Sequence, residues 1–289
     1  MQNISNHIKP EDKGDRTPAL DRAVAAAMHN AEIVLIPAGT WNFLTKPKPI
    51  GGGVTIHGES GIQSAHTGTC LFVRYSEAEP EAGFLTWDGT DPRGHKGTGG
   101  GLRDLSIYKY GKQHAGGCAI LVKPANCTNF RSGMWTLENV AVISENKGLW
   151  DRIALFDGSN IPPQYKEGMG LRVVTLRNFF ASGAAVCTVE LRNCVHFAWD
   201  TGQVQIGPAP TKTPACLKVT GADTQDVHLR SVSVYGLLHL EQGKLVNFDG
   251  LATSLRIDAG VKRSYVKALD CDTVSNKSAF EDRVTVITI

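Results

Sequence analysis

The sequence predicts an all-β chain wound into a parallel solenoid, a stack of coils in which each strand lies on a strand of the coil before. Three observations lead to this fold class. Glycine supplies 31 of the 289 residues and separates short apolar runs, as turns between strands do. At least a dozen such runs follow a single helical segment. A motif of Leu, a charged residue, Asn or a substitute, and then apolar-x-apolar also recurs along the chain.

The helical segment spans residues 17–29 and follows a polar extension at residues 1–13. Thr17 is the predicted N-cap, and Pro18 suits the first helical turn. The residues after them are rich in alanine and place their larger apolar side chains on one face. We expect this helix to cap the N-terminal end of the stack and to cover its exposed strand edge.

The recurring motif begins at Leu102, Leu137, Leu176, Leu191 and Leu229. Its Asn suits a turn, because Asn tolerates a left-handed backbone and its amide bonds to equivalent residues along a stack. Asp104 is interpreted as a substitute for this turn Asn, and Glu138 as a solvated neighbour. The third and fourth leucines are only 15 residues apart, which is short for a full coil. We therefore expect Asn178 and Asn193 to occupy different turns.

The solenoid is expected to cover residues 14–260, and a C-terminal strand segment residues 261–289. Within that segment, residues 283–289 alternate strictly between apolar and polar, so we expect an edge strand that contacts a partner subunit. A large antiparallel β-sandwich is the alternative fold. Against it, two-residue hairpin signals are few: Asp88-Gly89, Asp157-Gly158 and Asp249-Gly250.

Composition excludes several functional classes. Thirty Lys and Arg against 28 Asp and Glu give a net charge of +2, too balanced for a nucleic-acid binder that relies on phosphate neutralisation. No apolar stretch is long enough to span a membrane, and residues 1–12 lack the apolar core of a signal peptide. Seven cysteines, mostly within apolar runs, indicate reduced thiols. No motif for a P-loop or a zinc site is present, so we expect neither cofactor nor metal.

Three segments in the first sixty residues carry a family resemblance. Residues 14–23 read Gly-Asp-Arg-Thr-Pro-Ala-Leu-Asp-Arg-Ala, residues 33–41 read Ile-Val-Leu-Ile-Pro-Ala-Gly-Thr-Trp, and residues 53–58 read Gly-Val-Thr-Ile-His-Gly. In this order they resemble the opening of pectate-lyase-like right-handed β-helix proteins. The resemblance implies a right-handed parallel β-helix behind a short capping helix. It also implies one of two settings, a trimeric bacteriophage tailspike or tail fibre, or a secreted polysaccharide lyase or hydrolase.

The free thiols and the polar N-terminus favour the phage setting, because virion proteins fold in the host cytosol. The sequence therefore predicts a virion protein of tailspike or tail-fibre type. Its expected partners are host surface polysaccharide, two further copies of itself in a homotrimer, and other virion proteins, with no nucleic acid and no membrane insertion. The alternatives are a stand-alone, secreted polysaccharide lyase or glycoside hydrolase, and a purely structural virion subunit. Any enzymatic activity is expected to be polysaccharide depolymerisation.

Glycosidases work with paired carboxylates, and a stack of coils can bring together acids that are distant in sequence. The candidate catalytic residues are Asp151, Asp157, Glu190 and Asp200. The first two lie in a long excursion at residues 145–169 that also holds aromatic residues, a combination that suits sugar stacking and catalysis. The candidate carbohydrate-binding residues are Trp87, Trp150, Tyr165 and Trp199.

Overall fold

The computed structural model describes the chain except residues 31, 52, 62–67, 91–98, 110–115, 125–133, 145–149, 160–170 and 207–214. In the described ranges one α-helix, α1 (Thr17–Met28), accompanies the short 3-10 helices η1 (Ile4–His7), η2 (Pro10–Asp12) and η4 (Phe280–Asp282). The strands are β1 (Gln2–Asn3), β2 (Ile33–Ile36), β3 (Gly39–Phe43), β4 (Thr55–Gly58), β5 (Thr69–Val73), β6 (Gly83–Trp87), β7 (Gly100–Lys109), β8 (Cys118–Val122), β9 (Trp135–Ser144), β10 (Trp150–Asp157), β11 (Leu171–Arg192), β12 (Cys194–Ile206), β13 (Ala215–Thr220), β14 (Gln225–Lys262), β15 (Tyr265–Leu269), β16 (Thr273–Asn276) and β17 (Thr285–Thr288).

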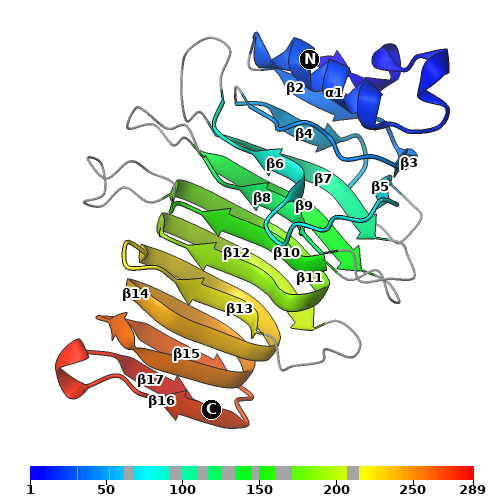
Figure 1. Ribbon diagram of the computed structural model, residues 1–289. Helices are drawn as coiled ribbons and strands as arrows, with labels where there is room; N and C mark the ends of the chain where they lie inside the picture. The colour runs from blue at the N-terminus through cyan, green and yellow to red at the C-terminus, as the bar shows by residue number, and fades with distance from the viewer. Residues whose placement is uncertain are drawn as a thin grey trace.

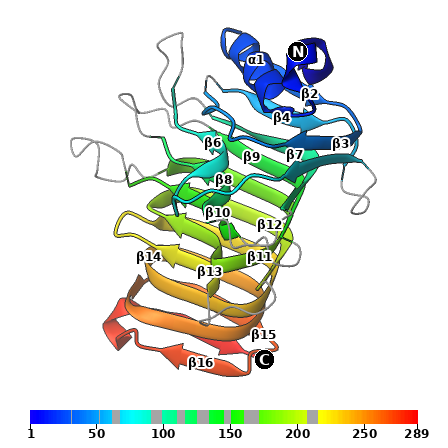
Figure 2. The same cartoon turned by 45° about the vertical axis from the view of Figure 1, so that its right-hand side comes forward.

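Parallel pairing organises the whole chain. Each pairing found between the described strands is parallel. Strand β9, for example, lies between β7 and β11. Figures 1 and 2 show the strands stacked as successive bands, with the two chain ends at opposite ends of the stack. The antiparallel β-sandwich alternative is therefore wrong, and the expected parallel stacking is confirmed.

The core consists of columns of apolar side chains, and each column takes one side chain from each coil that it crosses. Seven register partners, each at most 1% exposed, form its longest run: Val34, Ile56, Leu102, Leu137, Leu176, Trp199 and Leu229. Four of them are the motif leucines that the sequence analysis grouped. The fifth, Leu191, aligns instead with Phe156 and Val219 in a second column. The prediction that Asn178 and Asn193 occupy different turns is confirmed.

Two left-handed bends, five residues apart, recur in successive coils. The paired positions are Val173 and Asn178, His196 and Thr201, and Asp226 and Ser231, with φ between 50° and 61°. At the second bend, Asn178 Nδ2 donates to Asn139 Oδ1 at 3.0 Å, and Asn139 Nδ2 donates to Asp104 Oδ1 at 2.8 Å. The turn role predicted for Asp104 is confirmed. We call the outward-facing segment between the two bends of each coil, taken over all coils, the strip.

Helix α1 lies at the N-terminal end of the stack, where its apolar face joins the core, as expected of a cap (Figure 1). The prediction that Thr17 is its N-cap is wrong. The Thr17 hydroxyl donates to the Thr45 carbonyl at 2.8 Å, and the Thr17 backbone N–H donates to Asp15 Oδ1 at 3.0 Å. Asp15 thus satisfies the helix start, because its carboxylate reaches a backbone donor that Thr17 leaves open. Desolvation opposes ionisation of Asp15, but hydrogen bonds from Thr45 and Leu44 leave its pKa below the usual range.

The last 29 residues continue the same stack. Strand β15 pairs with β14, and β17 pairs with β15 in register from Tyr265 with Thr285 onward. Among the described strands β17 has no second neighbour, so it is an edge strand. Phe280, beside it, is 99% exposed. Contact of this edge with a partner subunit stays a prediction.

Most of the described cysteines are buried, as their places within apolar runs predict. Five are buried, namely Cys70, Cys118, Cys187, Cys194 and Cys216; Cys271 is half-buried, and all six are free thiols. Cys127 lies outside the described residues. No helix in the described part of the chain has the length and apolar character needed to cross a membrane.

Candidate functional site

Two of the four candidate catalytic acids come together on the outer face of the stack. Asp157 ends β10 and pairs in register with Arg192 on β11, and Glu190 precedes Arg192 by two residues on the same strand. Asp151, also on β10, is buried. Asp200 lies on β12 in the strip, on a different side of the coil, in register with Arg177 and Arg230. The structure therefore does not join the four acids into one site.

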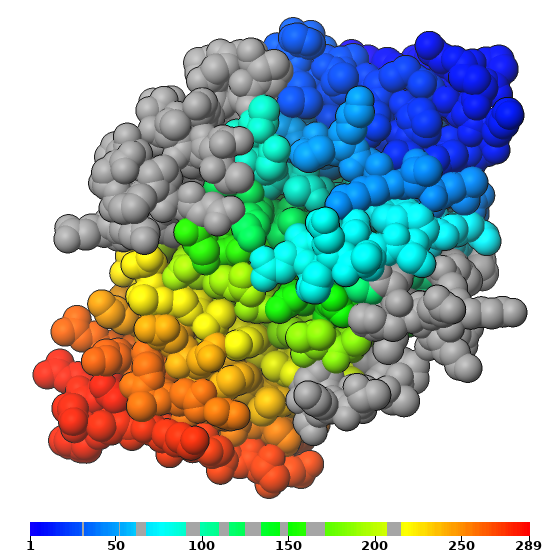
Figure 3. All heavy atoms as spheres, viewed as in Figure 1, coloured from blue at the N-terminus to red at the C-terminus, as the bar shows by residue number. Residues whose placement is uncertain are grey.

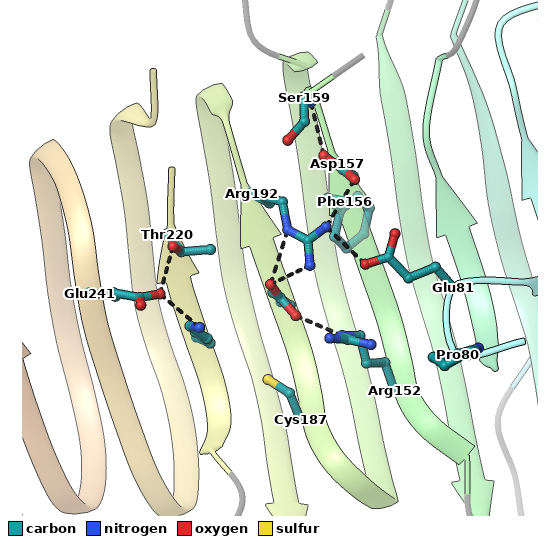
Figure 4. A network of polar contacts seen from close by, with 12 residues as sticks. Pro80, Glu81, Arg152, Phe156, Asp157, Ser159, Cys187, Arg192, Thr220 and Glu241 are labelled. Atoms are coloured by element: carbon teal, nitrogen blue, oxygen red, sulfur yellow. Dashed lines mark hydrogen bonds and ion pairs between the residues drawn. The ribbon is translucent and has the colours of Figure 1, made fainter. Parts of the chain in front are cut away.

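Arg192 is the centre of a network of six charged side chains, of which Figure 4 labels Arg192, Glu81, Asp157 and Arg152. Its guanidinium reaches Glu190 Oε1 at 2.9 Å, Glu81 Oε1 at 3.0 Å and Asp157 Oδ2 at 3.2 Å. Arg152 Nε binds the other oxygen of Glu190 at 2.6 Å. In the same network Lys123 Nζ lies 3.0 Å from Glu81 and 3.4 Å from Asp157. Three cations thus balance three carboxylates.

Burial makes this balance necessary. The side chains of Asp157 and Glu190 are 1% and 4% exposed. The side chain of Glu81, the third carboxylate, is 38% exposed. The hydrogen bond from Lys123 is the largest cause that lowers the pKa of Glu81 to about 2, and Arg192 adds to it. A general acid for glycoside cleavage has to hold its proton near neutral pH. Here each carboxylate is held by at least one cation within 3.4 Å, so we read the network as a structural clamp between coils.

The structure corrects the predicted tryptophan platforms. Trp87, Trp150 and Trp199 are at most 1% exposed. Trp87 packs edge-on against Trp135, and Lys109 Nζ lies 3.7 Å above the ring of Trp150. A ring without an exposed face cannot stack on a sugar, so the prediction is wrong for these three residues. Tyr165 lies outside the described residues.

One of the open sites on the described surface is a groove in the strip, towards its C-terminal end. It has a volume of about 550 Å³, and its polar and aromatic lining is His228, Arg230, Ser231, Asn247, Asp249 and Tyr265. These side chains come from three successive coils, because Asn247 pairs with Tyr265 and hydrogen-bonds to His228. Tyr265 is 40% exposed. None of the groove's lining residues was among the site residues predicted from the sequence. The sequence signal that could have located it is strand alternation: the residues on either side of the inward Leu229, Phe248 and Val266 must point outward.

An acid between two histidines adjoins the groove. Asp226 Oδ2 lies 2.5 Å from His196 Nδ1, and Asp226 Oδ1 lies 2.9 Å from His228 Nε2. Hydrogen bonding to His196 is the largest cause that lowers the pKa of Asp226. The aspartate therefore fixes the ring of His228, which lines the groove. Within the described residues no group of three or more His, Cys, Asp or Glu side chains is arranged to hold a metal ion.

The chain was compared with protein families, curated proteins and solved structures. No protein-family model and no curated protein matches the chain. Among solved structures it is similar to the crystal structure of PfbA, a surface adhesin of Streptococcus pneumoniae. The alignment covers 99% of this chain and 78% of that chain, with 12% sequence identity and a TM-score of 0.37.

Proposed function

We propose that the chain is a right-handed parallel β-helix whose role is to bind a polysaccharide along the strip. Two observations support the architecture. Register partners follow one another from coil to coil, and crossovers between parallel strands of one sheet are right-handed in about 98% of cases. The setting we propose is a phage virion, in a homotrimeric spike or fibre that recognises the host surface. The buried free thiols support folding in a reducing compartment.

The groove is the observation that carries the binding function. Sugars are recognised by planar polar side chains that hydrogen-bond to hydroxyl groups and by an aromatic ring that packs on the apolar ring face. Arg230, Asn247 and Asp249 supply the polar groups, and Tyr265 supplies the ring. The groove crosses the strands from coil to coil, so an extended chain lying in it runs along the long axis of the stack.

Binding is proposed in preference to cleavage. Asp157 and Glu190 are held in ion pairs by Arg192, and Asp249, within the groove, lies 3.3 Å from Lys267 Nζ. The described groove thus supplies hydrogen-bonding groups and no second carboxylate poised as its acid or base partner.

The test is glycan binding by the purified chain and by two single variants. A panel of bacterial surface polysaccharides is screened, and affinity for the best ligand is measured by calorimetry. Tyr265→Ala is expected to weaken binding roughly 2- to 12-fold, the value of one aromatic contact. Val274→Ala, which removes a side chain that is 47% exposed on β16 and outside the groove, is the matched control and leaves affinity unchanged.

Two results would overturn the proposal. One is the absence of binding across the panel, and the other is equal affinity of wild type and Tyr265→Ala for every ligand found. Assays for new reducing ends and for unsaturated uronates accompany the binding measurement. Release of either product shows that the chain is a depolymerase and not a binding protein alone.

A further inference from the structure

The outermost row of the strip carries charges of alternating sign. One residue from each of seven coils contributes, and register pairing along with the shared groove gives the order Arg103, Glu138, Arg177, Asp200, Arg230, Asp249 and Lys267. Every cation is therefore two coils from the next. Neighbouring parallel strands lie roughly 4.8 Å apart, so successive cations repeat at roughly 9–10 Å.

The middle of this row is not neutralised by its own neighbours. At the two ends, Arg103 Nε lies 3.5 Å from Glu138 and Lys267 Nζ lies 3.3 Å from Asp249. Between them, the side chains of Arg177, Asp200 and Arg230 make no ion pair or hydrogen bond with any residue that the structure describes. Arg177 and Arg230 are exposed, and Asp200 is half-buried between them. Two open guanidiniums thus flank one open carboxylate.

The adjacent row of the strip allows a ligand to come close. Next to the charged row stand Thr136, Thr175 and Ala198, one in each of three successive coils. These side chains are small, so a chain lying across them can reach the guanidiniums without a steric barrier. In the next coils the row continues as His228, Asn247 and Tyr265, which line the groove.

We infer that the strip selects a linear polysaccharide with one carboxylate per disaccharide repeat. The inference rests on the proposed function and names its ligand class. An arginine fork binds a carboxylate through two parallel hydrogen bonds, and the two-coil spacing of Arg177 and Arg230 is similar in length to the disaccharide repeat of an extended β-linked chain. Asp200 then faces the intervening neutral sugar. It accepts hydrogen bonds from hydroxyl groups and repels a carboxylate, which discriminates against polymers that carry a uronate at every sugar.

The test compares three octasaccharides by calorimetry at 0.15 M salt. They are hyaluronan, with a uronate at alternate sugars, polygalacturonate, with a uronate at every sugar, and chitin, which is neutral. Hyaluronan is expected to bind most tightly. Arg177→Gln and Arg230→Gln are each expected to weaken hyaluronan binding by up to roughly fivefold, the value of one exposed charge contact. Lys277→Gln is the charge-matched control, since Lys277 is exposed and lies beyond β16, and it leaves the preference intact.

A second variant tests the repulsion directly. Asp200→Asn removes the intervening charge and is expected to increase the affinity for polygalacturonate while hyaluronan affinity stays within twofold of wild type. Equal binding of the three glycans, or a preference for chitin, overturns the inference. If chitin binding is then still weakened by Tyr265→Ala, the proposed function stands without it. If none of the three binds, the inference fails, and the wider polysaccharide panel decides the proposed function.

Discussion

Arg192 is the residue whose removal tests the clamp between coils. In Arg192→Met the aliphatic part of the side chain is kept, but Glu81, Asp157 and Glu190 then share only Lys123 and Arg152. One carboxylate is left without a cation in a region where Asp157 and Glu190 are nearly inaccessible to water. Breaking a buried pair in this way costs about 3–5 kcal/mol. That is a large part of the roughly 5–15 kcal/mol by which folded proteins are stable.

Urea unfolding followed by tryptophan fluorescence measures this loss at pH 7. Arg230→Met is the matched control, because it removes an exposed guanidinium that forms no ion pair or hydrogen bond with any described residue. It is expected to change the free energy of unfolding by less than about 0.5 kcal/mol. The double variant Arg192→Met with Glu190→Gln removes one cation and one anion together, so it recovers part of the loss.

Acidification gives an independent check on the same clamp. The pKa of Glu81 is lowered from 4.5 to about 2 in the folded chain, so the unfolded chain takes up this proton first as the pH falls. The wild-type chain therefore loses stability between about pH 5 and pH 2. Without Arg192 this lowering of the pKa is smaller, and the stability gap between wild type and variant narrows in acid. A gap no larger than that of Arg230→Met, or one that widens in acid, would refute the reasoning.

Three further outcomes follow from the fold. Asn139→Ala is expected to lower the free energy of unfolding by roughly 1–2 kcal/mol more than Asn139→Gly does. The reason is that the φ of 53° at this bend strains any residue with a Cβ. Equal losses in thermal unfolding would show that the strain is absent. Asp15→Ala is expected to lower stability by about 0.5–2 kcal/mol through the lost helix cap, whereas Thr17→Val, which keeps the backbone donor, alters it less. Alkylation at pH 8, mapped by mass spectrometry, is expected to label Cys271 and to leave Cys187 unmodified in the folded chain. Complete burial raises the pKa of the Cys187 thiol far above its usual range, so little reactive thiolate forms. Equal labelling of the two cysteines would contradict the packing.

The repeat motif predicted the core because it encodes a local rule. Leu102, Leu137 and Leu176 each precede a left-handed turn by two residues, and this spacing places all three leucines in one inward column. Positions of this kind are set by backbone geometry within a few residues. They can therefore be predicted from a single sequence. The same rule separated Asn178 from Asn193.

The charged sites depend on which distant segments of the chain pair with one another. A pattern within a few residues does not predict that pairing. Glu81 and Arg192 meet across 111 residues of chain, and nothing near either residue specifies the other. The predicted tryptophan platforms are wrong for a different reason: nearness to a loop does not make a side chain exposed. Trp199 follows the inward Phe197 by two residues, so strand alternation already placed it in the core. Alternation is thus a better guide to exposure in this fold than distance from a loop.

Stacked coils with the chain ends at opposite poles have a mechanical consequence (Figure 3). The backbone hydrogen bonds between coils point along the long axis, so tension between the two ends loads them one coil at a time. Strand β17, which is held on one side only, is expected to peel first. Once β16 and β15 have also detached from β14, the 20 residues of the coil from Tyr265 to Thr285 release roughly 66–72 Å of contour length. The coil from Leu137 to Leu176 has 39 residues and releases about twice as much length. The lengths of successive unfolding steps under force would therefore give the sizes of the coils in order.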